Sequence, residues 1–327
     1  MNVPALFLAA AMIWGSTWLV IKFQLGVVAP EISVAYRFAL AAVLLALWCA
    51  ATGRSLKFSS REHAWLATLG VGMFGLNYIG VYWAEVYVTS GLVAVVFSAI
   101  TFMNPIGMRL AFGTPVAGRT FVAATLGVVG VALLFLPELE QARHGGSVAI
   151  GIAFAIGATV IASAGNMVAM RNNASDMAVF PSTAWSMAYG SITAAIVATL
   201  QGVPWSFDAR APYVLSLLYL AVVGSILAFG AYLTLLKRVG GGPAAFVSVL
   251  TPVIALTLST LFEGYRWTWV AGVGVVLAVL GNLLALAPAW PRRRRHTGAE
   301  SPDSVHGAVV SGSSLSAGRP RLSDPVE

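Results

Sequence analysis

The feature that most constrains this chain is a series of ten apolar stretches, separated by short polar or Gly/Pro-containing joints such as "TGRSLKFSSREH". A helix needs about 20 mainly apolar residues to cross the hydrocarbon core of a bilayer. Each of the ten stretches reaches about that length, so each is predicted to be a transmembrane helix. The expected spans are residues 5–23, 32–51, 64–84, 92–110, 118–136, 148–169, 178–200, 212–235, 243–262 and 268–288.

The overall composition supports a membrane protein. Hydrophobic residues make up 58% of the chain and charged residues only 9%, whereas ordinary globular domains carry roughly a quarter charged residues. Lipid offers the backbone no hydrogen-bond partner, which favours helices, and the apolar runs lack the alternation of barrel strands. The predicted fold class is therefore an all-α polytopic membrane protein with ten transmembrane helices.

The basic residues predict the orientation of the spans, because Lys and Arg concentrate in cytoplasmic joints. With the N-terminus inside, the outer joints hold only Arg143, Arg210 and Arg266. The inner joints hold Arg54, Lys57, Arg61, Arg109, Arg119, Arg171, Lys237 and Arg238. Both termini are thus expected in the cytoplasm, in a multi-pass protein of the cytoplasmic (inner) membrane.

The net charge of +7 owes much to one run, Arg292 to Arg295, directly after the last apolar stretch. This position indicates a cytoplasmic anchor at the lipid surface rather than a nucleic-acid-binding patch. The residues that follow are rich in Ser, Gly, Pro and Arg, so 289–327 is predicted to be a disordered cytoplasmic tail.

A weak internal repeat relates the two halves of the chain at a shift of 150 residues. The matching pairs are Gly80 with Gly230, Tyr82 with Tyr232, Gly91 with Gly241, Ala94 with Ala244, Ser98 with Ser248, Thr101 with Thr251, and Phe112 with Phe262. The halves are predicted at 1–139 and 140–288. Because each would hold five helices, the second enters the membrane from the opposite side. Such inverted repeats are typical of secondary transporters.

Four segments resemble a known family: "WGSTWLVIK" (14–22), "YRFALAAVLLAL" (36–47), "GLVAVVFSAITF" (91–102) and "RVGGGPAAFVSVLTPVIALTLSTLFEG" (238–264). They are similar to the ten-helix EamA-type exporters of the drug/metabolite transporter superfamily. The resemblance covers about 1–288 and implies two EamA-like five-helix repeats and export of metabolites. The chain departs from the pattern at Glu85, at Pro105, and at Gly113, which matches Glu263 of the second half.

Three ionisable residues are expected near the outer ends of their helices: Lys22, Arg37 and Glu85. Charges inside a membrane are costly and usually have a partner, so Arg37 or Lys22 is predicted to pair with Glu85. Two interpretations remain open: a structural ion pair, or Glu85 as a group that binds a coupling proton or a substrate amine. Glu263 is expected to be unburied at the outer interface, and Pro252 is expected to kink the ninth helix.

Polar and aromatic residues at helical spacing predict the lining of a central cavity, mostly apolar and aromatic. This lining suits amino acids or their derivatives, or amphipathic drugs. The alternative for each hydroxyl is a hydrogen bond within the membrane helices. The candidate substrate-binding residues are Trp14, Asn77, Tyr78, Tyr82, Ser98, Thr101, Asn166, Tyr232, Ser248 and Thr251.

Catalytic, metal and cofactor sites are not expected. His63, His144, His296 and His306 fall in joints or the tail, and the chain has no H-E-x-x-H or G-x-S-x-G motif and no ATP-binding motif. Pore-lining charge rings typical of channels are also missing.

The sequence therefore predicts a secondary transporter, an exporter, that works by alternating access. Its expected partners are the lipid bilayer, a small-molecule cargo and protons as a candidate coupling ion. A metabolite importer and a membrane-embedded sensor remain alternatives, and the oligomeric state stays open because glycine-rich faces can pack within one bundle or between two.

Overall fold

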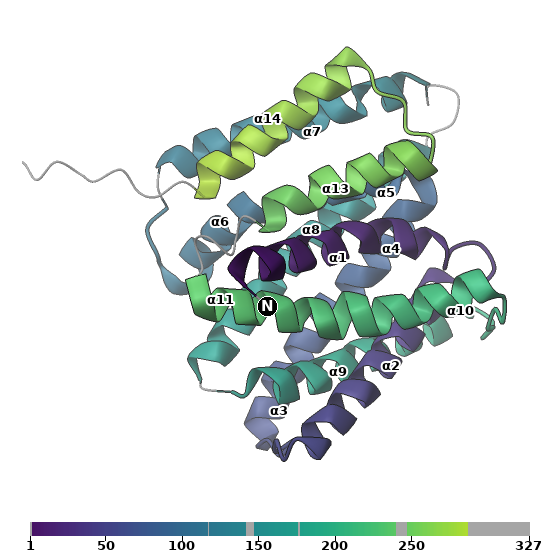
Figure 1. Cartoon of the computed structure of the whole chain (residues 1–327), viewed down its shortest axis with the longest axis vertical. Coiled ribbons are helices and arrows are strands. Elements are labelled where there is room, and N and C mark those ends of the chain that lie inside the picture. Colours follow the sequence, from purple (N-terminus) through teal and green to yellow (C-terminus); the bar gives the residue numbers. More distant parts are fainter. Residues whose placement is uncertain (1, 117, 142–146, 176, 240–246, 287–327) are drawn as a thin grey trace, which may run out of the picture. The chain divides into compact units, whose positions relative to one another are not determined.

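The computed structural model describes residues 2–116, 118–141, 147–175, 177–239 and 247–286, and in these residues it contains helices and connecting segments but no strand (Figure 1). The helices are α1 (Val3–Lys22), α2 (Pro30–Ala51), α3 (Ser60–Leu69), α4 (Asn77–Tyr87), α5 (Ser90–Phe97), α6 (Ile100–Phe112), α7 (Gly118–Gln141), α8 (Ser147–Ala174), α9 (Val179–Leu200), α10 (Ala211–Leu218), α11 (Ala228–Val239), α13 (Val247–Phe262) and α14 (Trp269–Leu286).

These helices confirm the predicted all-α polytopic fold. Within the described residues, 9 helical segments are long and apolar enough to cross a membrane, and α13 is a shorter apolar helix described from Val247 onward. The third span is one continuous helical segment, Ser60–Tyr87, and the fourth is Ser90–Phe112. The expected start of the ninth span at 243 and the predicted tail at 289–327 lie outside the described residues.

The third span begins earlier than expected, at Ser60 rather than residue 64, because a capping box fixes its start. The carboxylate of Glu62 accepts a hydrogen bond from the Ser59 backbone N–H at 2.6 Å, and the Ser59 hydroxyl accepts one from the Glu62 N–H. The placement of His63 in a joint is therefore wrong. It lies in the first turn of α3, half-buried, with its ring centre 4.7 Å from that of Trp185.

Two spans contain wide π-helical segments that the sequence analysis did not predict. One, Gly70–Leu76, joins α3 to α4, and the other, Tyr219–Leu227, joins α10 to α11. In the second segment the Ser225 hydroxyl donates to the carbonyl oxygen of Leu220, five residues earlier, at 2.9 Å. π-Helical turns in proteins are rare and often occur at functional sites, so these segments are candidate points of flexure.

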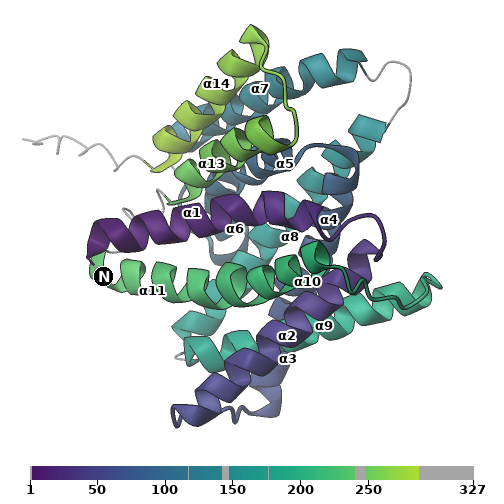
Figure 2. The ribbon, with the colours of Figure 1, turned by 45° about the vertical axis from the view of Figure 1, so that its right-hand side comes forward.

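The packing of the helices pairs equivalent spans of the two expected halves. Helix α2 packs against α9, α5 against α13, and α7 against α14. Helix α1 lies between α11 and α13 (Figure 2), and its counterpart α8 packs against α4 and α6. Every one of these contacts joins a helix from before residue 140 to one from after it.

The helix ends gather at two opposite ends of the bundle. At the first, the end of α1 reaches the end of α4, where Lys22 Nζ donates to the Glu85 carbonyl oxygen at 2.5 Å. At the second, the start of α3 lies beside the middle of α9, where the Tyr189 hydroxyl lies 3.1 Å from His63 Nδ1. We refer to these as the Lys22 end and the His63 end.

Helices α7 and α14 approach so closely that their backbones touch (Figures 1 and 2). A Cβ atom placed on Gly130 would lie 2.6 Å from the carbonyl oxygen of Gly274, and one on Gly274 would lie 2.6 Å from that of Gly130. Small residues permit this approach between membrane helices, where dispersion contacts rather than water exclusion drive association.

This contact predicts that Gly274→Leu destabilises the protein, because overpacking of a tight contact costs about 1–3 kcal/mol. Gly272→Leu, on the same helix, is the matched control, since a Cβ there meets no atom within 4 Å. Thermal unfolding of the purified protein in detergent should show a lower midpoint for Gly274→Leu than for Gly272→Leu. Equal midpoints would contradict the close packing of α7 on α14.

Candidate functional site

Buried charged and polar side chains gather at the Lys22 end, and they define a group that we call the Lys22 cluster. Its core is three charged residues, Glu31, Arg37 and Glu85, which are 0%, 1% and 0% exposed. Ionisable residues inside membrane segments are costly and usually functional. The full cluster consists of Lys22, Gln24, Glu31, Arg37, Tyr82, Glu85 and Glu263.

Hydrogen bonds and ring contacts tie this cluster to α2 and α4. The Tyr82 hydroxyl donates to Gln24 Oε1 at 2.6 Å, and the Trp83 indole N–H donates to Glu31 Oε1, also at 2.6 Å. The Arg37 guanidinium lies 4.6 Å from the ring centre of Tyr78, a cation–π distance. The Arg37 charge therefore rests on an aromatic face.

Lys22 and Glu263 together connect four segments at this end. Its ammonium donates to the carbonyl oxygens of Glu85 and Val88, at 2.5 and 2.9 Å, and lies 3.6 Å from Glu263 Oε1. The Glu263 carboxylate in turn accepts hydrogen bonds from the Ser90 backbone N–H at 3.2 Å and from the Ser90 hydroxyl. Helices α1, α4 and α5 and the residue after α13 thus meet at one lysine and one glutamate.

The predicted pairing of Lys22 or Arg37 with the Glu85 carboxylate is wrong, because Lys22 forms its ion pair with Glu263. The free carbonyls at the end of α4 attract the ammonium, and the free N–H groups at the start of α5 attract the Glu263 carboxylate. Glu263 is also not the unburied residue that the sequence predicted, since its side chain is only 11% exposed.

Several polar atoms of the cluster are buried and have no hydrogen-bond partner in the described part of the chain. These atoms are both carboxylate oxygens of Glu85, Nε and Nη1 of Arg37, Oε2 of Glu31 and Nε2 of Gln24. Buried polar groups are normally satisfied, and the exceptions point to strain, a bound group or a change of state. The cluster therefore contains both hydrogen-bond donors, on Arg37 and Gln24, and acceptors, on Glu31 and Glu85, that no described residue uses.

Aromatic side chains form a continuous chain from this cluster toward the His63 end. Arg37 lies at its beginning, over Tyr78, and the last ring, Tyr232, packs on Trp14 nearer the start of α1. Trp14, Tyr78, Phe229 and Tyr232 are only half-buried. The successive ring-centre distances are 4.7 Å for Tyr78–Phe38, 5.3 Å for Phe38–Phe74, 6.5 Å for Phe74–Phe229, 5.5 Å for Phe229–Trp14 and 5.1 Å for Trp14–Tyr232.

Other predicted lining residues take part in contacts within or between helices. Asn77, which is 1% exposed, donates its amide to the Ala158 carbonyl oxygen of α8 at 2.7 Å. Asn166 donates to Asn104 Oδ1 at 3.3 Å, and Thr251 donates to the Val247 carbonyl oxygen of its own helix at 2.9 Å. These bonds match the structural alternative for such residues.

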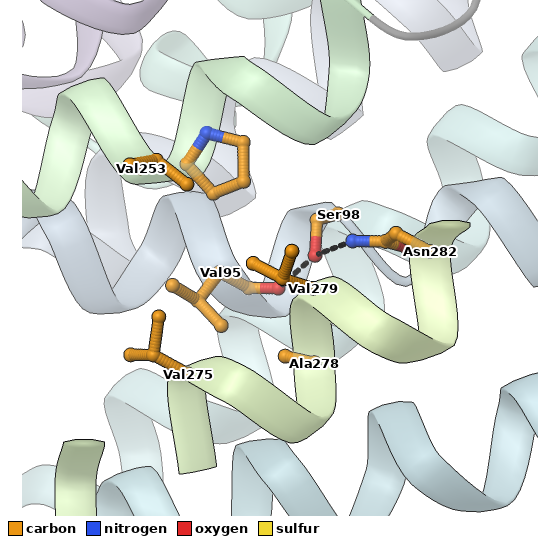
Figure 3. Close-up of a pocket in the computed structure, with 8 residues that line it drawn as sticks. Val95, Ser98, Val253, Val275, Ala278, Val279 and Asn282 are labelled. Atoms are coloured by element: carbon orange, nitrogen blue, oxygen red, sulfur yellow. Dashed lines mark hydrogen bonds between the residues drawn. The ribbon is translucent and has the colours of Figure 1, made fainter. Parts of the chain in front are cut away.

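Ser98 faces α14 rather than the aromatic chain (Figure 3). Its hydroxyl accepts from Asn282 Nδ2 at 3.0 Å and donates to the Val95 carbonyl oxygen at 2.7 Å. Both residues line a small crevice between α5, α13 and α14 that Pro252 also borders. Thr101 and Ser248 are half-buried, and the Thr101 hydroxyl oxygen is buried without a hydrogen-bond partner.

An open cleft of about 400 Å³ lies beside the Lys22 cluster. Its lining is Lys22, Val86, Tyr87, Val88, Thr89 and Glu263. Lys22 and Glu263 thus belong both to the lining of this cleft and to the Lys22 cluster. No group of three or more His, Cys, Asp or Glu residues that could hold a metal ion occurs in the described residues.

The segment before α10 packs onto the start of α2, next to the cluster. Tyr36 donates to the Ser206 carbonyl oxygen at 3.2 Å, and its ring centre lies 5.8 Å from that of Phe207. Outside the spans, hydrogen bonds from Arg210 lower the pKa of the Asp208 carboxyl below its ordinary value. The contact between the Asp208 carboxylate and Arg210 therefore stabilises the conformation of this segment.

Four polar residues at the Lys22 end were not predicted as site residues: Gln24, Glu31, Ser90 and Glu263. Glu31 follows Pro30 at the start of α2, a signal for the first turn of a helix but not for burial. Ser90 begins α5, and its partner comes from more than 170 residues along the chain. Sequence spacing alone carries no information on such long-range contacts.

Comparison with known proteins identifies the kind of molecule to which this site belongs. A "Probable amino-acid metabolite efflux pump" of Escherichia coli (strain K12) is 26% identical over 84% of this chain and 92% of its own length. The "Uncharacterized inner membrane transporter YedA" of the same organism is 28% identical over 88% and 92%. "Protein PagO" of Salmonella typhimurium is 20% identical over 87% and 93%.

One solved crystal structure shares the fold, with a TM-score of 0.62 and 16% identity over 86% of this chain and 96% of that chain. The model of the EamA-like transporter family matches residues 3–136 and again 149–287. The family and the relatives point to a transporter rather than an enzyme. The chain belongs to the EamA-like transporter family.

Proposed function

We propose that this protein is a secondary active exporter of small amphipathic metabolites, such as amino acids or their derivatives, or of amphipathic drugs. It works by alternating access between the halves 1–139 and 140–288, in the cytoplasmic membrane. The observation that carries this proposal is the aromatic chain, which starts at a buried guanidinium and in which four of the six rings, those other than Phe38 and Phe74, are half-buried. The name of the efflux pump among the relatives favours amino-acid metabolites.

The two halves have support from two independent observations. The family model matches each half separately, at 3–136 and 149–287. The π-helical segment 70–76, moved by the 150-residue shift, becomes 220–226, within the second segment, Tyr219–Leu227. Flexure at equivalent points of the third and eighth spans fits an exchange of conformations between the halves.

The inverted relation of the halves is supported by the equivalent residues Tyr82 and Tyr232. Tyr82 bonds to Gln24, which follows the end of α1, whereas Tyr232 packs on Trp14, one turn or more closer to the start of α1. Equivalent positions of the halves thus lie at different depths along the same helix. Inverted repeats place equivalent residues on opposite sides of the bilayer midplane.

The chemistry of the aromatic chain favours a solute with an apolar body and a carboxylate. Aromatic faces bind apolar and cationic groups, and the free Nε and Nη1 donors of Arg37 are suited to a carboxylate. The Lys22 end is closed by buried groups in this conformation, so cargo enters from the His63 end. We take protons as the coupling ion, since Glu85 is a buried carboxylate whose oxygens have no hydrogen-bond partner in the described residues.

The first prediction concerns export. Cells that express the protein should enrich at least one amino acid or derivative in the medium relative to empty-vector cells. Trp14→Ala should lower the initial export rate by about 2- to 10-fold, the equivalent of one aromatic contact. Trp269→Ala is the matched control, since Trp269 is 81% exposed and outside the aromatic chain.

The measurement is quantitative metabolite profiling of the medium at matched membrane expression. Depletion of a solute from the medium would instead indicate import. Unchanged medium across several carbon and nitrogen sources would contradict transport of such solutes and favour a sensor. Equal loss in Trp14→Ala and Trp269→Ala would remove the aromatic chain from the proposed path.

The second prediction concerns orientation. In a background with Cys49→Ala, a cysteine at Val27, which is 58% exposed at the Lys22 end, should react with a membrane-impermeant maleimide in intact cells. A cysteine at the exposed Ser55, between α2 and α3, should react only after permeabilisation. The opposite pattern would place the Lys22 end in the cytoplasm and reverse the proposed direction of access.

A further inference from the structure

The carboxylate of Glu85 is in an unusual position for a charged group. The residue is 0% exposed, and neither carboxylate oxygen has a hydrogen-bond partner in the described residues. The Lys22 ammonium is within 2.5 Å of the backbone oxygen of Glu85, yet its ion pair is with Glu263. One lysine thus lies within reach of two carboxylates but pairs with only one.

The two carboxylates belong to different halves of the proposed transporter. Glu85 is on α4, in the first half, and Glu263 follows α13, in the second half. Contact between the halves is tight here, since a Cβ placed on Gly91 of α5 would lie 2.8 Å from the Cα of Leu256 of α13. Any movement that opens the Lys22 end between α5 and α13 must carry Glu263 away from Lys22 and Ser90.

From this arrangement we propose that closure of the Lys22 end and binding of a proton at Glu85 are one linked step. The proposal rests on the proposed alternating-access function. When the end is closed, Glu263 holds Lys22 and Glu85 carries the proton. When the end opens, Glu263 leaves, a side-chain rotation brings the Lys22 ammonium to the Glu85 carboxylate, and Glu85 releases its proton. Lys22 and Glu263 stay ionised throughout, so one proton is exchanged with water per opening.

The environment of Glu85 on each packed element agrees with this step. An ionised carboxylate without a partner is strongly disfavoured away from water, whereas a protonated one is tolerated. The charges that act on it are Lys22 of α1, Glu263 beyond α13 and Arg37 of α2. At this level α5 contributes Ser90 and α8 contributes Gly151, neither of them ionisable.

Each of the remaining titratable neighbours makes a contact of its own, although some atoms of Arg37 and Glu31 have no hydrogen-bond partner in the described residues. Tyr82, on the same helix, donates to Gln24, and Glu31 of α2 accepts from the Trp83 indole. Tyr213 of α10 lies 3.1 Å from the Ser33 hydroxyl. The Arg37 guanidinium is directed onto the Tyr78 ring. Lys22, whose ammonium already contacts the Glu85 backbone oxygen, is the partner that we assign to the Glu85 carboxylate in the open state.

The sign of the pH effect follows from the proton balance. The closed state binds one proton more than the open state, so acidic pH favours closure and alkaline pH favours opening. For a single linked proton the ratio of open to closed molecules changes by about tenfold per pH unit, over the range in which Glu85 is protonated in the closed state and ionised in the open state.

The test is a distance measurement across the Lys22 end. Spin labels are placed at Val27→Cys, after α1, and Arg266→Cys, after α13, in a Cys49→Ala background, and the protein is reconstituted in lipid nanodiscs. Both label sites are exposed, and Cys49 is buried. Pulsed EPR distances are then recorded across about pH 5 to 9. The population of the longer distance is expected to rise with pH.

Two variants separate the roles of the carboxylates. Glu85→Gln, which mimics the protonated residue, should keep the short distance at every pH. Glu263→Gln leaves Glu85 as the sole partner of Lys22 and should raise the long-distance population and move the transition to lower pH. Glu31→Gln is the matched control, a second buried carboxylate of the cluster, and should retain the pH dependence.

Three outcomes would overturn the proposal: distances that ignore pH in the labelled parent, pH dependence that survives in Glu85→Gln, or pH dependence lost in Glu31→Gln alone. Size-exclusion profiles of each variant check that it is folded. The distance measurement needs no cargo. If the distances contradict the proposal while the protein still exports a solute, the link between closure and proton binding at Glu85 is rejected and the exporter function is not. A pH-dependent opening without export of any solute would reject the exporter and leave the linked step standing.

Discussion

The cost of placing charge in lipid governs how this molecule is organised. A charged group in the hydrocarbon must find a partner, lose its charge or reach the interface. Lys22 meets this demand with three oxygens from two segments, the carbonyls of Glu85 and Val88 at the end of α4 and the carboxylate of Glu263 after α13. Because those segments come from both sides of residue 140, satisfying one ammonium holds the Lys22 end together.

The same principle explains the contrast between the two ends of the aromatic chain. At the Lys22 end the polar groups are buried, and the atoms without a hydrogen-bond partner in the described residues, such as Nε and Nη1 of Arg37 and both carboxylate oxygens of Glu85, occur together. Toward the other end the rings of Trp14 and Tyr232 are half-buried and need no hydrogen-bond partners for their faces. The members of a polar network strengthen one another, so the network is strongest when every group is in place. This property suits a transporter that must close one end at a time.

The sequence predicted the elements well and the contacts between them poorly. The spans follow from apolar runs of about 20 residues, a local property that lipid enforces. Asn77 was expected to need a partner and donates to Ala158. The π-helical segments were missed because a search for the 3.6-residue period does not register wider turns. The Lys22–Glu263 pair was missed because it depends on which helix ends meet in space.

The central claim is that two halves alternate access to one solute, and a counterflow measurement tests it most directly. Purified protein is reconstituted in sealed vesicles preloaded with the unlabelled compound that export profiling identifies, and the same compound in labelled form is added outside. Alternating access predicts transient accumulation of label inside, above its outside concentration, that vanishes without preload. Label that only equilibrates would indicate a channel, and label that never enters would contradict transport altogether.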